Sequence, residues 1–245
     1  WYLRHLRERI GLPSARGDVR KTDVFLWSLD EAPHAAATRF GGMPYLPLGR
    51  PWPRRHGVDG RFLAQLGFAD SRELVPFAPA DVLLVFTFDH ADASSWERDD
   101  YEFVWVDVDD AAEHHGPEHV PPNGLDPAVA LHGVRVRSFD EPSLVARIRA
   151  EELPHVHCIQ ATKIGGAATD RQGIEPPETP ADWRFLGQIA AQWPTNDTPF
   201  PVLGHAAPVT YGEPAFRDLM RGPGDGVLCL YLDAAGDVQL HFSCA

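Results

Sequence analysis

The stretch TRFGGMPYLPLGRPWP, residues 38–53, decides how this chain is organised, because its opening recurs as TKIGG at residues 162–166. Both copies place a threonine, a cation, an apolar residue and two glycines in the same order. Downstream, FLAQL at residues 62–66 matches FLGQI at residues 185–189, at nearly the same distance from the glycines. Matched blocks at matched spacing indicate an internal duplication.

A third match extends the duplication, since DVLLVFTFD at residues 81–89 corresponds to GVLCLYLD at residues 226–233. Each copy is therefore expected to hold a Gly-Gly loop, a strand with one glutamine and a buried strand. We predict a single domain over residues 1–245, with an N-terminal helix and linker over 1–21, a first copy at about 22–150 and a second copy at about 151–245.

Apolar and alternating patterns predict a chain rich in β-strands. The run DVLLVFTFDH is nearly continuous in apolar, aromatic and β-branched residues, which indicates burial on both faces of a sheet. The end of the chain predicts a hairpin with its loop at residues 233–237. The predicted strands cover residues 23–29, 61–68, 81–90, 101–110, 132–139 and the two arms of the hairpin over 226–242.

Two short helices are predicted between these strands. DEPSLVARIRAEEL, residues 140–153, opens with Asp140 as a cap and has a proline in its first turn. GEPAFRDLMRGP, residues 212–223, repeats that pattern and ends in Gly-Pro. Together the elements predict an α+β fold, in which β-rich antiparallel sheets with a few short helices are built from two pseudo-repeats.

The repeated residues are also the candidate ligand-binding site. Each Gly-Gly pair fits a turn that needs positive φ, or a nest of backbone amides that cradles an anion beside a cation. Each glutamine lies in an apolar strand, so its amide must bond to main-chain groups of its own Gly-Gly loop or contact a ligand. The candidate set is Arg39, Gly41, Gly42, Gln65, Lys163, Gly165, Gly166 and Gln188.

The blocks TRFGGMPYLPLGRPWP, FLAQLGFAD, VLLVFTFD and TKIGG closely resemble the YwqG-like family of bacterial proteins of unknown function. The resemblance runs from about residue 38 to the C-terminus and implies an α+β fold with antiparallel sheets and no established catalytic residues. Some relatives lie near toxin–immunity genes. The second copy departs from the family pattern, because AATDRQG after the second Gly-Gly pair keeps only Gln172.

The net charge of the chain limits the classes of partner that it can bind. The net charge is -13, which disfavours nucleic acid and anionic membranes and suits a basic protein partner or solubility alone. Residues 89–126 hold twelve Asp and Glu against one cation, Arg98. This stretch is either a solvated face, a docking patch for a basic partner or a loose calcium site, although the EF-hand spacing is absent.

Recognisable catalytic and cofactor motifs are absent from the sequence, and we expect no cofactor. His155 and His157 in HVHC are weak candidates for metal ligands, since a structural zinc site uses four. Three cysteines, Cys158, Cys229 and Cys244, fit a reducing cytosol better than a disulfide framework, and a Cys–His catalytic pair stays open. No apolar run reaches the length of a membrane span, so we expect a cytoplasmic protein.

Two functions follow from these patterns. The first is a non-enzymatic binding or immunity-like protein with an acidic surface. The second is an enzyme or small-ligand-binding protein whose site lies between the two Gly-Gly repeats. A deep cleft with perturbed titratable groups favours the second, and a flat acidic or aromatic patch favours the first.

Overall fold

A computed structural model of the chain describes residues 19–28, 30–88, 98–109, 111–121, 130–140, 162–168, 180–190 and 226–244. Its strands are β1 (Arg20–Ser28), β2 (Arg39–Gly41), β3 (Arg54–Arg55), β4 (Val58–Asp59), β5 (Arg61–Gly67), β6 (Val82–Thr87), β7 (Tyr101–Val106), β8 (Ala130–Asp140), β9 (Lys163–Gly165), β10 (Arg184–Ala190), β11 (Gly226–Leu232) and β12 (Val238–Cys244). Its 3-10 helices are η1 (Ala69–Ser71), η2 (Arg98–Asp100) and η3 (Pro117–His119).

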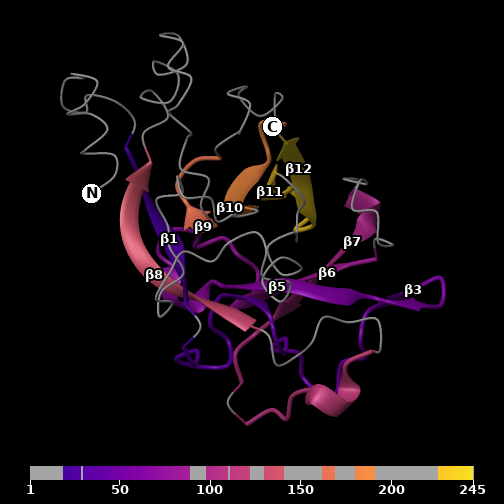
Figure 1. Cartoon of the computed structure of the whole chain (residues 1–245). Helices are drawn as coiled ribbons and strands as arrows, with labels where there is room; N and C mark the ends of the chain where they lie inside the picture. The colour runs from indigo at the N-terminus through magenta and orange to yellow at the C-terminus, as the bar shows by residue number, and fades with distance from the viewer. Residues whose placement is uncertain are drawn as a thin grey trace.

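Ten of these strands form one antiparallel sheet in the order β12-β11-β10-β9-β1-β8-β2-β5-β6-β7, and β3 pairs with β4 alone (Figure 1). The two longest strands, β1 and β8, lie at its centre, with Arg20 opposite Asp140 and Ser28 opposite His132. The sheet curls into a nearly closed, barrel-like shape. Arg98 links its two edge strands, because Nε donates to the carbonyl of Val238 in β12 and Nη1 to that of Tyr101 in β7.

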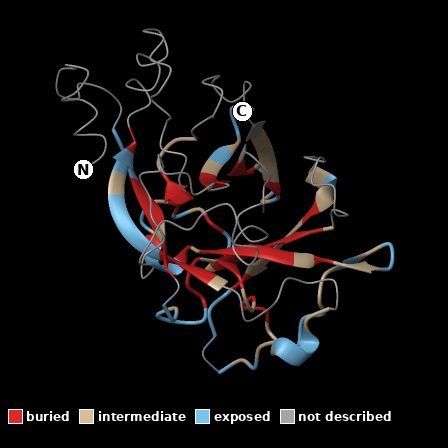
Figure 2. Ribbon diagram, viewed as in Figure 1, coloured by how far each residue is buried: buried red, intermediate tan, exposed pale blue. Residues whose placement is uncertain are grey.

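The interior of the curled sheet holds the largest hydrophobic cluster, and the strands that line it are mostly buried (Figure 2). Full burial of one such side chain is worth about 1.5–3 kcal/mol. The cluster draws on nearly every strand, including Trp27 of β1, Leu83 of β6, Leu131 of β8, Ile164 of β9 and Leu228 of β11, each at most 2% exposed. One interior is therefore shared by both ends of the sheet.

The expected α+β class is wrong, because the described residues form strands and only three short 3-10 helices. The physical reason is that the sheet curls over its own apolar face, so that no helical layer is needed to cover the core. The predicted helices near the N-terminus and at residues 140–153 and 212–223 lie outside the described residues, except that Asp140, expected as a cap, ends β8.

The predicted strands are confirmed, with shifts at their ends. The largest shift is in the strand expected to reach residue 110, which ends at Val106. Beyond it, the Val108 amide donates to the carboxylate of Asp81 and the Asp109 amide donates to the hydroxyl of Tyr45, at 3.2 and 3.0 Å. These backbone amides therefore donate to side chains, whereas in a longer strand they would be available for hydrogen bonds to a neighbouring strand.

The two halves of the sheet share an unusual register. Arg39 lies opposite Gln65, and Lys163 lies opposite Gln188. In both halves the strand that carries the glutamine has a register shift against the strand that follows it. The shift comes after Phe62 in β5, which pairs with β6, and after Phe185 in β10, which pairs with β11. All four glycines of the repeated pairs have positive φ, between 60° and 78°, so the expected turn is confirmed.

We propose that the halves are copies and that the second copy begins with β8, not near residue 151 as the sequence suggested. The strand order supports this, because the two sides of the sheet have the same sequence of strands from the centre to the edge. On one side β8 is followed by β2, β5, β6 and β7. On the other side β1 is followed by β9, β10, β11 and β12. The first strand of each copy then pairs with the Gly-Gly strand of the other. The registers agree, since Val24 faces Lys163 and His132 faces Arg39.

This crosswise pairing predicts that neither half folds alone. Residues 1–129 and 130–245, expressed separately, should each lack a cooperative thermal transition, because each loses the partner of its first strand. Expressed together, they should form a one-to-one complex with β-rich circular dichroism. Size-exclusion chromatography and thermal melts test this, and a cooperative melt of either half by itself would count against the exchange of strands.

Candidate functional site

Gln65 is fully buried, and its amide joins the chain on both sides of the first Gly-Gly turn. Its Nε2 donates to the carbonyls of Ala35 and Ala37, at 2.9 and 2.7 Å. Its Oε1 accepts from the amide of Tyr45, at 2.9 Å. The expected main-chain role is confirmed for Gln65, which uses both amide atoms within the protein. Gln188, in the second half, is also fully buried.

Arg39 also forms hydrogen bonds to the backbone on both sides of the first Gly-Gly turn. Its Nη2 donates to the carbonyls of Ala35 and His34, at 2.6 and 3.3 Å, and its Nη1 donates to that of Met43, at 3.3 Å. Burial lowers the pKa of Arg39, because the charged guanidinium loses hydration. Its contacts are thus directed to the backbone that surrounds Gly41 and Gly42.

The second Gly-Gly turn holds an anion that belongs to the protein. The carboxylate of Asp140 accepts from the Nζ of Lys163, at 2.6 Å, and from the amide of Ala167, at 2.9 Å. Lys163 is 1% exposed. A side chain at Gly166 would collide with the Asp140 carboxylate. Lys163 and the turn therefore bind an internal carboxylate, and the glycine is needed to admit it.

The predicted site residues fall into two separate groups. Arg39, Gly41, Gly42 and Gln65 surround β2, while Lys163, Gly165, Gly166 and Gln188 surround β9. In the sheet these strands are separated by β1 and β8, which at about 4.8 Å per strand puts them roughly 14 Å apart. Ligand binding by these eight residues stays a prediction.

A second candidate, which the sequence located only in part, is a pair of loops at the end of β7. The loop pair, as we call residues 45–50, 107–109 and 111–119, is held together by hydrogen bonds. The hydroxyl of Tyr45 accepts from the Asp109 amide and donates to its carbonyl, at 3.0 and 3.1 Å. The amide of Leu48 donates to the Glu113 carbonyl, at 2.7 Å, and that of His115 to the Leu46 carbonyl, at 3.0 Å.

Aromatic contacts and an ion pair fix the same region. The ring of His114 lies 4.0 Å from that of Tyr45, between centroids. Although partial burial raises the pKa of Asp81, hydrogen bonds from the Val108 amide and from Arg72 outweigh it and leave that pKa below its ordinary value. Asp81 therefore keeps its charge at neutral pH and anchors the start of the loop at residues 107–109.

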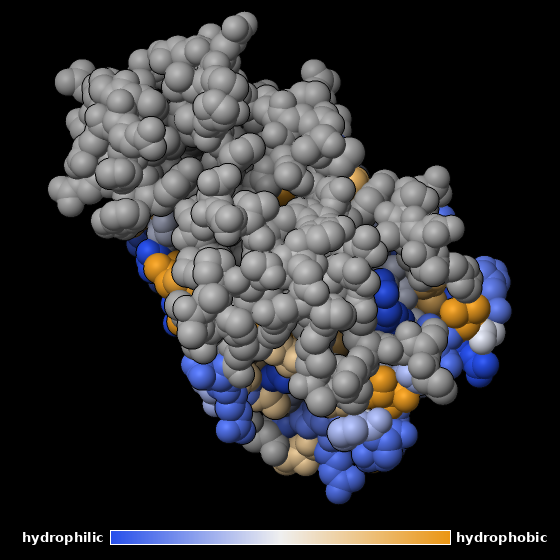
Figure 3. Space-filling model, viewed as in Figure 1, coloured by the Kyte–Doolittle hydropathy of each residue, from blue (hydrophilic) through white to orange (hydrophobic). Residues whose placement is uncertain are grey.

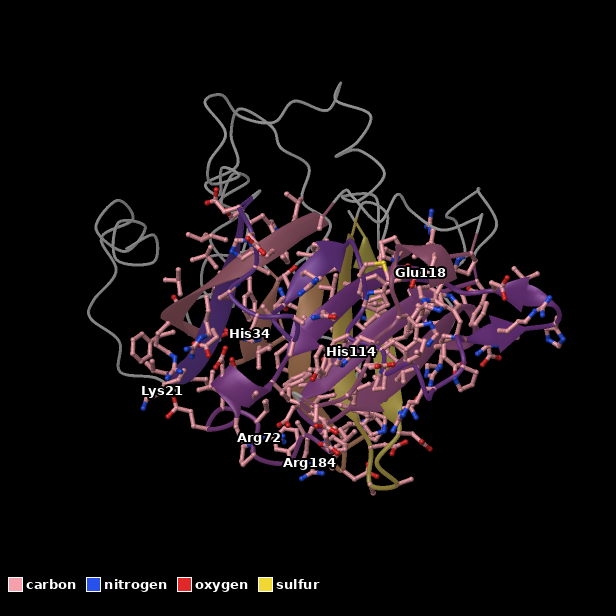
Figure 4. The ribbon with its side chains drawn as sticks, turned by 90° about the horizontal axis from the view of Figure 1, so that it is seen from below. Lys21, His34, Arg72, His114, Glu118 and Arg184 are labelled. Atoms are coloured by element: carbon pink, nitrogen blue, oxygen red, sulfur yellow. The ribbon has the colours of Figure 1, made fainter. Side chains whose placement is uncertain are left out.

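The surface of the loop pair combines carboxylates with aliphatic side chains. Leu48 and Val108 are 41% and 38% exposed. The exposed carboxylates are those of Asp107, Asp109, Glu113 and Glu118. Figure 4 shows His114 and Glu118 in different parts of this region. Their placement depends on contacts between residues about 60 positions apart, such as Tyr45 with Asp109, which the local pattern of the sequence does not reveal.

Metal and cysteine chemistry find no support in the described part of the chain. It contains no group of three or more His, Cys, Asp or Glu side chains that could hold a metal ion. Cys229 is 1% exposed in the core, and His155 and His157 lie outside the described residues. Within the same part of the chain, no helix is long and apolar enough to cross a membrane.

The chain belongs to a family described as "Domain of unknown function (DUF1963)", which matches residues 38–210. The match begins at the first repeated threonine and ends beyond β10, so it includes both Gly-Gly turns and both buried glutamines. A comparison with curated proteins finds no match to the chain. The narrower YwqG-like label stays a prediction.

Replacing Gln65 with Leu should lower the free energy of unfolding by about 1–3 kcal/mol, because backbone groups of residues 35, 37 and 45, the last two buried, lose their partner. Denaturant titration measures this change. Gln239→Leu is the control, since Gln239 is half-buried and makes one bond to Asp233. Equal stability of the two variants would contradict the scaffold role of Gln65.

Replacing Lys163 with Met should cost about 3–5 kcal/mol of stability, because it leaves the carboxylate of Asp140 without its buried counter-ion. The double variant Lys163→Met/Asp140→Asn should recover part of the loss, since the neutral amide still accepts from Ala167. Chemical denaturation of both variants tests the pair. A single variant as stable as the parent protein would show that Asp140 is not held by Lys163.

Proposed function

We propose that this protein is a non-enzymatic binding protein, of the immunity type, whose partner is a basic protein that docks on the loop pair. The observation that carries the proposal is the composition of that surface, which combines two exposed aliphatic side chains with four exposed carboxylates. Protein interfaces commonly combine an apolar centre with a polar rim. The family itself has no assigned function, so the proposal goes beyond it.

The carboxylates of the loop pair are available to a partner. Among the described residues, Asp107, Asp109 and Glu113 have no arginine, lysine or histidine within ion-pair distance, while Glu118 contacts His119 at 3.1 Å. With the net charge of -13, these groups would attract a cationic protein and accelerate its encounter at low salt. The same charge disfavours nucleic acid and anionic membranes, as expected from the sequence.

The rigidity of the loop pair also supports binding. Hydrogen bonds between its distant segments, including one between His115 Nε2 and the Arg50 carbonyl, hold the backbone that carries the carboxylates before any partner arrives. A preformed surface loses less conformational entropy on association than a mobile one. In Figure 3 the described residues on the visible face include both blue, hydrophilic and orange to tan, hydrophobic areas, a mixture that suits a contact surface.

The alternative, an active or ligand site between the two Gly-Gly repeats, has weaker support. Lys163 is neutralised by Asp140, and Arg39 donates to main-chain carbonyls. A ligand at either turn would have to displace these internal partners, at the cost of the bonds that they make.

The test begins by recovering a partner with the tagged chain from the native organism. Association rates are then measured for Asp107→Asn/Glu113→Gln and for a control of equal charge, Asp182→Asn/Asp237→Asn, whose exposed carboxylates lie elsewhere. The first variant should associate about 3–10 times more slowly at low salt, and the control should be nearly unchanged. Equal slowing of association in both variants would show that only the net charge matters, and it would contradict docking on the loop pair.

A further inference from the structure

A cavity of about 530 Å³ lies outside both the loop pair and the Gly-Gly turns. Most of the segment at residues 30–38 lines it, together with Phe25, Gly67, the start of η1 and part of β8. Its volume falls in the range of pockets that hold small ligands. Its ionisable side chains are Asp30, Glu31, His34, Asp70, His132 and Arg135, and Thr38 adds a hydroxyl. Figure 4 shows His34, in this cavity, well apart from His114, in the loop pair.

His132 lines the cavity, and its ring makes one hydrogen bond within the protein. The side chain is 8% exposed, and its Nδ1 lies 2.7 Å from the carbonyl oxygen of Asp30. Because a carbonyl oxygen only accepts, this Nδ1 carries the proton, and the Nε2 of the neutral ring is a lone-pair acceptor. Among the described residues this Nε2 has no hydrogen-bond partner. A nearly buried acceptor on a cavity wall fits a ligand that donates.

The charged side chains of the cavity favour a cationic ligand. Its carboxylates are those of Asp30, Glu31 and Asp70, and its basic side chains are Arg135 and His34, whose Nε2 lies 3.4 Å from the Asp70 carboxylate. Arg135 is already committed, because its Nη1 donates to the Asp70 carbonyl at 2.7 Å and lies 3.4 Å from the fully buried carboxylate of Asp23. The cavity thus has an excess of negative charge.

The cavity wall is preformed by the repeated residues. Arg39 and Gln65 bond to the carbonyls of residues 34, 35 and 37, and of these His34 and Ala37 line the cavity. A side chain at Gly67 would collide with the Ala36 carbonyl, so the glycine permits the close approach of the wall to β5. The repeated motif is therefore connected to a candidate site through the position of its backbone.

We propose that this cavity binds a compact organic cation with N–H donors, namely a primary ammonium or guanidinium group. The carboxylates of Asp70, Asp30 and Glu31 offset its charge, and the Nε2 of His132 accepts one of its N–H groups. Such a group belongs both to free amines and to lysine or arginine side chains of a protein. The inference is independent of the loop pair, since the two sites share no residue.

Calorimetric titration of the intact chain with n-butylamine and n-butylguanidinium tests the proposal, with tetramethylammonium and butyrate as probes that lack an N–H donor or a positive charge. The amine or the guanidinium should bind saturably and at least about 5 times more tightly than either control probe. Tighter binding of Nα-acetyl-lysinamide than of butylamine indicates a protein side chain as the source, and the reverse order indicates a free amine. Equal binding of tetramethylammonium, or no saturable binding, overturns the proposal.

Two variants locate the binding. Asp70→Asn removes a 59% exposed carboxylate with little effect on folding and should weaken the amine about 3–10 times. His132→Gln should weaken the ammonium probe while leaving the weak binding of tetramethylammonium unchanged, and a thermal melt confirms that it folds. Asp107→Asn, in the loop pair, is the matched control and should change nothing. Unchanged amine affinity in Asp70→Asn would overturn the assignment to this cavity.

Discussion

The antiparallel pairing of β1 with β8 is the constraint on which the rest of the molecule depends. These strands join the two sides of the sheet, and each also positions a Gly-Gly strand, β9 beside β1 and β2 beside β8. An ion pair reinforces the centre, because the exposed Arg137 of β8 donates to the buried carboxylate of Asp23 in β1, directly opposite it. Ser71 of η1 donates to the same carboxylate, at 2.7 Å, so the ion pair also holds the segment after β5 against the sheet.

Local sequence patterns predicted the elements well and their assembly poorly. The strands and the positive-φ turns follow from residues close in sequence, such as the apolar run at Val82–Thr87 and the repeated glycines. The fold class does not, because closure of the sheet depends on contacts such as Arg98 with Val238, which are 140 positions apart. Asp140 is a second example, because its local sequence predicts a helix cap, whereas in the structure it ends β8 and pairs with Lys163.

The functional sites were harder to predict than the fold for a related reason. The repeated polar residues attract attention in the sequence, but Gln65 and Arg39 bond to backbone, and Lys163 bonds to Asp140. The candidate sites lie in the segments between repeated blocks, at residues 30–38 and 107–119. Their side chains converge only through tertiary contacts, as in the approach of His132 to Asp30. Loops that connect the strands of a sheet are also the general location of binding residues.

The burial of Lys163 also has a consequence for the chemical reactivity of the chain. The sequence has two lysines, and only Lys21 is exposed in the fold, whereas Lys163 is 1% exposed and paired with Asp140 (Figure 4). Amine-directed reagents, cross-linkers and conjugating enzymes therefore find one lysine side chain on the native protein. The second becomes reactive only when β9 leaves the sheet, so modification of Lys163 would record the opening of the barrel.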